Sequence, residues 1–194
     1  MTDINTVCEF MRELDALKLV NRRSYVGGGV RLENSAEHSW HLAMACWSIA
    51  RQFNLAVDEG ELLKLALVHD LGEIDAGDTF LYAVERAQAD KAERACVARM
   101  QQHPGNGIQD LLDYWEEQET GSSPETKLIK VVDRLLPFLL NVSSEGRAWR
   151  ENGVKKSQVL RAHAFIETEF PPIYQWIRTR VDDAVKRGWL ADDC

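Results

Sequence analysis

A histidine and an aspartate stand side by side, His69 and Asp70, where an unusually apolar stretch of the chain ends. The preceding segment, LLKLALV, predicts a buried helix, and a charged side chain at its buried end is costly unless it is paired or bound to a metal. Donor groups held there by a rigid element would form a preorganised metal site. The best candidate partners are His38, near the start of another expected helix, and Asp133, a lone carboxylate inside the apolar run KVVDRL.

Two imidazoles and two carboxylates make a mixed nitrogen and oxygen donor set for one divalent metal ion. On a six-coordinate ion they leave two positions for water and a phosphate oxygen, so Mn²⁺, Co²⁺, Fe²⁺ and Mg²⁺ are as plausible as Zn²⁺. A structural zinc site would be closed and richer in thiolates, and the four cysteines contain no CxxC pair. Such a metal acidifies a bound water and polarises a phosphoryl oxygen.

The motifs around these residues resemble the HD-domain metal-dependent phosphohydrolases and, within that superfamily, the 5′-deoxynucleotidase branch. The segments that carry the resemblance are LKLVNR, RLENSAEHSWH, HDLGEIDAGD and KVVDR, which fall within residues 14–140. The resemblance implies a single HD-type phosphohydrolase domain over residues 1–194. It also implies that the metal ligands are His38, His69, Asp70 and Asp133.

The same resemblance assigns roles to three further residues. It implies that Glu73 orients or activates the attacking water, that Asp78 contacts the substrate near the scissile bond, and that Arg22 contacts the phosphate. Glu73 comes three residues after Asp70, so a continuing helix would place it about one turn further on, where it can accept a proton. An arginine suits a site rich in carboxylates, because its planar fork matches phosphate and offsets the repulsion. The chain departs from its relatives at Arg23, where they carry tryptophan on the side of the sugar and base.

Each of these positions also has a plainer interpretation. Glu73 can be a solvated loop acid, and Asp78 can cap the segment that follows it. Glu37 fits a first-turn acid favoured by the helix dipole, and His41 fits a packing or supporting role better than a ligand role. The glycines Gly27–Gly29 have no expected strand before them, so we expect a flexible loop that can act as a lid.

Helical periodicity extends over nearly the whole chain, and strand signals are almost absent. We therefore expect an all-α fold, a single bundle of about eight helices. The clearest of them cover about residues 4–19, 35–53, 58–69, 84–102, 108–118 and 124–140, and two more flank Pro171-Pro172. Asp3, Ser35, Asp58 and Ser123 are the expected N-caps. We found no linker, internal repeat or low-complexity segment.

Composition limits the classes of partner. The 194 residues carry a formal net charge of −8, which argues against a nucleic-acid polymer and against anionic lipid. No apolar run approaches the roughly 20 residues that span a membrane, and the N-terminal sequence has no signal-peptide pattern, so we expect a cytoplasmic protein. An acidic protein can still bind one phosphate where a metal supplies positive charge.

Together, these residues predict a metal-dependent phosphomonoesterase that hydrolyses (deoxy)nucleoside 5′-monophosphates to nucleoside and phosphate. The closest alternatives are another HD-type nucleotide phosphohydrolase, acting as a diphosphatase or phosphodiesterase, and a non-catalytic metal- or nucleotide-binding regulatory module. The lack of additional His and Asp residues for a second metal favours the monoesterase, and the presence of Glu73 and Asp78 favours an enzyme. By resemblance we also expect a homodimer.

Overall fold

The computed structural model describes residues 3–82 and 86–193, which belong to two compact units. The first unit comprises Met1–Arg22, Asn34–Thr79 and Ala83–Ile129, and the second comprises Arg23–Glu33, Phe80–Tyr82 and Lys130–Cys194. In the described part of the chain, no helix is both long enough and apolar enough to cross a bilayer.

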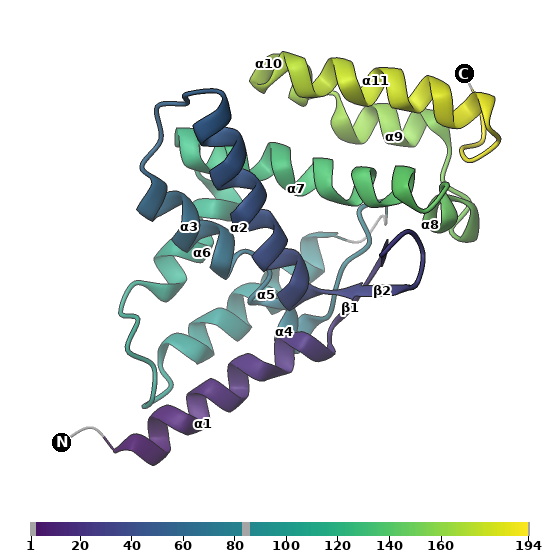
Figure 1. Ribbon diagram of the computed structural model, residues 1–194. Coiled ribbons are helices and arrows are strands. Elements are labelled where there is room, and N and C mark those ends of the chain that lie inside the picture. Colours follow the sequence, from purple (N-terminus) through teal and green to yellow (C-terminus); the bar gives the residue numbers. More distant parts are fainter. Residues whose placement is uncertain (1–2, 83–85, 194) are drawn as a thin grey trace. The chain divides into compact units, whose positions relative to one another are not determined.

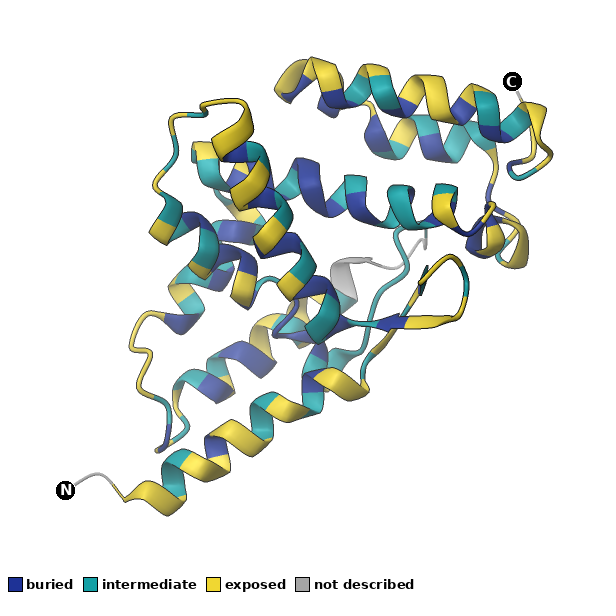
Figure 2. Cartoon of the chain, in the orientation of Figure 1, coloured by how far each residue is buried: buried dark blue, intermediate teal, exposed yellow. Residues whose placement is uncertain are grey.

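The first unit is built from helices. They are α1 (Ile4–Asp15), the short 3₁₀ helix η1 (Ala16–Leu19), α2 (Ser35–Gln52), α3 (Glu59–Val68), α4 (Glu73–Ala76), α5 (Arg86–Gln101) and α6 (Leu111–Thr120) (Figure 1). α2 packs along α3, α3 packs on α6, and α5 packs on both α4 and α6. Buried positions recur every three or four residues along α2, as expected for an amphipathic helix (Figure 2).

The core of the first unit holds the turn that follows α3. Leu71, in that turn, is buried in one cluster with Phe10, Met100 and Trp115. Its neighbour Gly72 permits a close approach of α5, because an added Cβ would lie 2.6 Å from the Cβ of Glu93. The backbone of the two residues that flank this pair, Asp70 and Glu73, is thereby held in place by packing.

The second unit contains the later helices and most of a hairpin. Its elements are α8 (Arg147–Glu151), α9 (Lys156–His163), α10 (Ile166–Glu169), α11 (Pro171–Lys186), and the strands β1 (Asn21–Val26) and β2 (Arg31–Asn34). α7 (Pro124–Ser143) begins in the first unit and continues into the second. α9 and α10 pack against α11, and Phe138 lies at the centre of an aromatic cluster with Trp149, Trp176 and His163.

The hairpin corrects the expected flexible loop. Residues 21–34 form two paired strands, and Gly27, Gly28 and Gly29 make the turn between them with φ values of 59°, 70° and 108°. Such backbone angles favour glycine over residues with a Cβ. The carbonyl of Gly29 also accepts a hydrogen bond from Arg147 Nη1 (2.8 Å). The strands escaped prediction because they are short and carry arginines where alternating apolar residues would have marked them.

The helical predictions hold, with local differences. Within residues 3–82 and 86–193, eight helices have eight residues or more, and the additional ones, α4, α8 and α10, are only four or five residues long. Asp3 and Asp58 cap their helices as expected, but the N-cap of α2 is Asn34 rather than Ser35. The expected start of the fifth helix, at residue 84, lies outside the described residues.

Candidate active site

The beginning of α2 is fixed by a capping box. The Asn34 side chain accepts a hydrogen bond from the Glu37 N–H (2.9 Å), and Glu37 in return accepts one from the Asn34 N–H (3.3 Å). The first-turn interpretation of Glu37 is thus confirmed. The capped turn places His38 on the inner face of α2, with none of its side chain exposed. His41, one turn later, stacks on Trp40 with ring centroids 6.4 Å apart.

The end of α3 places the second histidine and both acids. α3 ends at Val68, and His69 is its C-cap. We expected the helix to continue to Glu73, but it does not. Instead, the Glu73 N–H donates to the carbonyl of Asp70 (3.0 Å), and Glu73 starts the separate helix α4. A turn, and not a further turn of α3, therefore connects Asp70 to Glu73.

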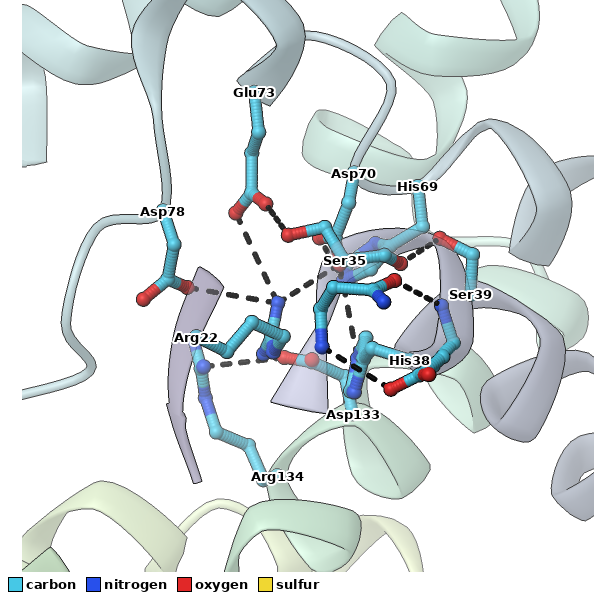
Figure 3. Close-up of polar contacts among 12 residues, drawn as sticks. Arg22, Ser35, His38, Ser39, His69, Asp70, Glu73, Asp78, Asp133 and Arg134 are labelled. Carbon is cyan, nitrogen blue, oxygen red and sulfur yellow. Dashed lines mark hydrogen bonds and ion pairs between the residues drawn. The ribbon is translucent and has the colours of Figure 1, made fainter. Parts of the chain in front are cut away.

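Three of the predicted metal ligands meet in the first unit (Figure 3). The rings of His38 and His69 are 6.0 Å apart between centroids, and one nitrogen of each ring lies within 4.8 Å of the other. The Asp70 carboxylate lies between them, with Oδ1 3.4 Å from His69 Nε2 and Oδ2 4.0 Å from His38 Nε2. Two imidazoles and a carboxylate, largely buried, match the donor atoms that divalent transition metals prefer.

The fourth predicted ligand, Asp133, belongs to the second unit. It lies on α7, is buried, and pairs with Arg134 Nη1 at 3.1 Å. Its role as a metal ligand stays a prediction.

Arg22, the second residue of β1, lies among three acids of the first unit (Figure 3). Its Nη1 is 2.8 Å from Asp70 Oδ2, 3.6 Å from Asp78 Oδ1 and 3.8 Å from Glu73 Oε1. The side chain is only 11% exposed. Asp78 therefore lies beside Arg22 in the candidate site, and its contact with the substrate stays a prediction. A largely buried guanidinium beside candidate metal ligands is a suitable group to bind phosphate.

Glu73 is buried, which contradicts its interpretation as a solvated loop acid. Its Oε2 accepts a hydrogen bond from Ser35 Oγ at 2.5 Å. Burial raises the pKa of Glu73 well above its ordinary value, and the negative charge of Asp70 raises it further, while Arg22 and the Ser35 hydrogen bond oppose the shift. A carboxylate in this environment accepts a proton readily near neutral pH.

Two polar residues of this site escaped the sequence analysis. Ser35 was expected only as a helix cap, yet its hydroxyl holds Glu73. Gln118 on α6 is buried, and its Oε1 lies 2.7 Å from His69 Nδ1. The signal for Gln118 was present in the sequence, because it continues the apolar stripe of Leu111 and Trp115, where a polar side chain needs a buried partner.

Curated relatives of this chain carry the name 5′-deoxynucleotidase. The protein HDDC2 of Danio rerio is 30% identical over 135 residues, which are 68% of this chain and 66% of the relative. The protein YfbR of Escherichia coli is 30% identical over 139 residues, which are 67% of this chain and 69% of the relative. The chain thus matches just under two thirds of the length of the first of these relatives.

A solved structure resembles the whole chain. A predicted metal-dependent phosphohydrolase from Magnetospirillum magnetotacticum is 31% identical, with a TM-score of 0.84, and the match covers 98% of this chain and all of that one. The HD domain family model matches residues 14–174. That match includes every predicted site residue, and it extends over well more than half of the sequence. The chain therefore belongs to the HD-domain family.

Proposed function

We propose that this chain is a metal-dependent phosphomonoesterase that hydrolyses (deoxy)nucleoside 5′-monophosphates to a nucleoside and inorganic phosphate. The observation that carries the proposal is the Arg22 guanidinium held between Asp70, Glu73 and Asp78. This arrangement places a cation that can bind phosphate next to the candidate metal ligand Asp70 and next to the candidate proton-transfer groups Glu73 and Asp78. The names of the curated relatives support the substrate class.

In this proposal one divalent metal ion is held by His38, His69, Asp70 and Asp133. The donor set supports this, since two imidazoles with carboxylates can bind Mn²⁺, Co²⁺, Fe²⁺, Mg²⁺ or Zn²⁺. A metal bound there supplies positive charge to a phosphoryl oxygen and lowers the pKa of a water. The family match over residues 14–174 draws on both units, which supports one functional domain over residues 1–194.

The side chains of the site divide the remaining work. Arg22 exchanges contacts with its carboxylates for contacts with two phosphate oxygens and stabilises the charge that develops on them. Glu73 takes the proton of the attacking water at its carboxylate, and Ser35 keeps that carboxylate in place. Asp78 positions the sugar or delivers a proton to the departing 5′ oxygen, so that the nucleoside leaves as a neutral alcohol.

We also propose that the protein is a cytoplasmic homodimer. Trp40, Met44 and Trp47 recur at helical spacing on α2 and remain 64%, 45% and 38% exposed, which supports a surface that a second copy covers. Within residues 3–82 and 86–193, Cys8 and Cys96 carry free thiols, as is usual in a reducing compartment. Light scattering should give twice the 22.1 kDa mass of the chain, and Trp40→Glu should reduce it to one chain.

The enzymatic proposal is tested by hydrolysis of a panel of ribo- and deoxynucleoside 5′-monophosphates, with nucleoside diphosphates and phosphodiesters assayed beside them. The chelator-treated protein is assayed with each candidate metal, beside Asp70→Ala and Asp75→Ala. Asp75 is the matched control, because it lies only five residues after Asp70 but is exposed. Its carboxylate pairs with Arg99 on α5. We expect metal-dependent hydrolysis that Asp70→Ala abolishes and Asp75→Ala retains. Activity unchanged in Asp70→Ala, hydrolysis confined to diesters or diphosphates, or nucleotide binding without turnover would each refute it.

A further inference from the structure

We infer that Gln118 is a positioning residue for His69: it determines which ring nitrogen carries the hydrogen, and so leaves Nε2 available to a metal. This inference rests on the metal site of the proposed function. It concerns a residue of α6 that the resemblance assigned no role.

Gln118 is embedded in the first unit, with 1% of its surface exposed. It lies on the buried face of α6 with Leu111 and Trp115. A primary amide at such a position is costly unless both of its ends are hydrogen-bonded. Its Oε1 is 2.7 Å from His69 Nδ1, and its Nε2 donates to Glu119 Oε1 (3.0 Å) and to the backbone carbonyl of His69 (3.4 Å).

These partners fix the orientation of the amide. Both atoms that face Gln118 Nε2 are oxygens that can only accept hydrogen bonds, so the nitrogen belongs on that side and Oε1 must face His69. An amide oxygen only accepts, and therefore His69 Nδ1 carries the hydrogen. In the neutral imidazole, Nε2 then bears the lone pair that a metal needs.

The tautomer also decides how His69 interacts with Asp70. His69 Nε2 lies 3.4 Å from Asp70 Oδ1, so a lone pair on the nitrogen faces a carboxylate oxygen. Two acceptor atoms attract a cation rather than each other. In the opposite tautomer, Nε2–H would donate to Asp70, and this hydrogen bond would occupy both ligands at once. Gln118 thus excludes the internal hydrogen bond that competes with the metal.

The experiment compares Gln118→Leu, which removes the acceptor at similar volume, with Gln118→Glu, which keeps an oxygen there. Gln102→Leu, at an exposed position, is the matched control. Zn²⁺ affinity is measured by competition with a chromophoric chelator. We expect Gln118→Leu to weaken Zn²⁺ binding about 10- to 100-fold, the range usual for groups that orient a ligand. We expect Gln118→Glu to recover most of the loss and Gln102→Leu to match wild type.

A second readout needs no metal. Long-range ¹H–¹⁵N spectra of histidine side chains in the metal-free protein report the tautomer of each ring, with His69→Gln identifying the signal. We expect the Nδ1–H form for His69 in wild type and the Nε2–H form in Gln118→Leu. An Nε2–H form in wild type would overturn the inference even if Gln118→Leu failed to fold.

The two proposals can fail separately. If wild type binds no Zn²⁺, or if His69→Ala binds it equally well, the metal site of the proposed function is wrong. If wild type binds Zn²⁺ and a folded Gln118→Leu binds it with unchanged affinity, the inference about Gln118 is wrong and the metal site stands.

Discussion

Two largely buried histidines, one in each unit, show how differently the same side chain can be used. In the second unit, both ring nitrogens of His163 face backbone carbonyls: Nδ1 lies 2.7 Å from the oxygen of Val159, and Nε2 lies 3.2 Å from that of Arg134. In the first unit, His69 contacts side chains instead, the amide of Gln118 on one nitrogen and the carboxylate of Asp70 near the other. Main-chain carbonyls fix the orientation of a buried imidazole ring, whereas a carboxylate that faces the ring forms, together with it, a pair of groups that can bind a cation.

The surroundings of the two rings differ in the same way. His163 packs edge-on against Phe138, with centroids 5.4 Å apart, in an aromatic cluster. His69 lies beside the buried acid Asp70, which also pairs with Arg22. Burial alone therefore does not separate a structural histidine from a candidate ligand. The chemical type of the partners does.

The largest expected contrast is in activity. Glu73→Gln removes the proposed proton acceptor while preserving its shape, so we expect kcat to fall about 10²- to 10⁴-fold, the usual contribution of a general base. His163→Gln should leave kcat near wild type, because its partners are structural. Phosphate release at saturating nucleotide and metal checks both variants. Comparable losses in the two would break the contrast between the units.

The same Glu73 substitution should have the opposite effect on stability. The pKa of Glu73 is raised in the folded state, so its contribution to stability is fully present below the ordinary value of 4.5 and is lost as pH rises through the folded pKa. Glutamine cannot ionise and avoids this loss. Metal-free Glu73→Gln should therefore unfold at a higher urea concentration than wild type at pH 8. A lower midpoint would show that Glu73 stabilises the metal-free fold.

A smaller contrast is expected between adjacent arginines. Side chains of consecutive strand residues point to opposite faces. Arg22 lies among the acids of the first unit, whereas Arg23 donates to Asn152 Oδ1 (2.7 Å) and stacks over the Phe80 ring in the second. Arg22→Ala should lower kcat/KM about 10- to 150-fold, the equivalent of about 1.5–3 kcal/mol of charged hydrogen bonding. Arg23→Ala should lower kcat/KM much less. An equal loss of kcat/KM in the two variants would indicate that the substrate also contacts Arg23.

Features set by neighbours in sequence were predictable. The caps at Asp3 and Asp58, and the helices that they start, depend on residues within one turn, so the sequence alone located them. Features set by distant partners were not. Gln118 meets His69 across 49 positions, and no local pattern shows which polar side chain a buried glutamine will meet.

The division into two units could not be predicted from amino-acid composition, because no polar linker separates the units. Three of its boundaries fall inside β1, β2 and α7, and the other two lie between α4 and α5. A search for linkers therefore finds none. Three of the four candidate metal ligands nevertheless lie close together, as the sequence predicted, even though a turn from Asp70 to Glu73 replaces the expected continuing helix.

Packing supplies the next contrast, between two glycines of the first unit. Gly72 has helical backbone angles, yet an added Cβ would lie 2.6 Å from the Cβ and 2.7 Å from the Cα of Glu93. Gly107 has no atom within 4 Å of an added Cβ. Gly72→Ala should lower the free energy of unfolding by about 1–3 kcal/mol, as overpacking does, and should also reduce activity by displacing the turn. Gly107→Ala should leave the free energy of unfolding unchanged in urea denaturation. If both variants lost the same free energy, close packing against Glu93 would not be the cause of the loss at Gly72.

The smallest expected effect returns to the buried histidine of the second unit. Burial lowers the pKa of His163 below its ordinary 6.5, and its contacts with the two carbonyls only partly oppose this. The folded state then binds fewer protons than the unfolded one, so stability is complete above pH 6.5 and declines as pH falls toward the folded pKa, by at most about 1.4 kcal/mol per pH unit. His163→Gln should flatten this decline in urea denaturation series from pH 7.5 to 5. An undiminished slope would mean that another group titrates there. A steeper decline in His163→Gln than in wild type would mean that the two carbonyls stabilise a charged His163 ring.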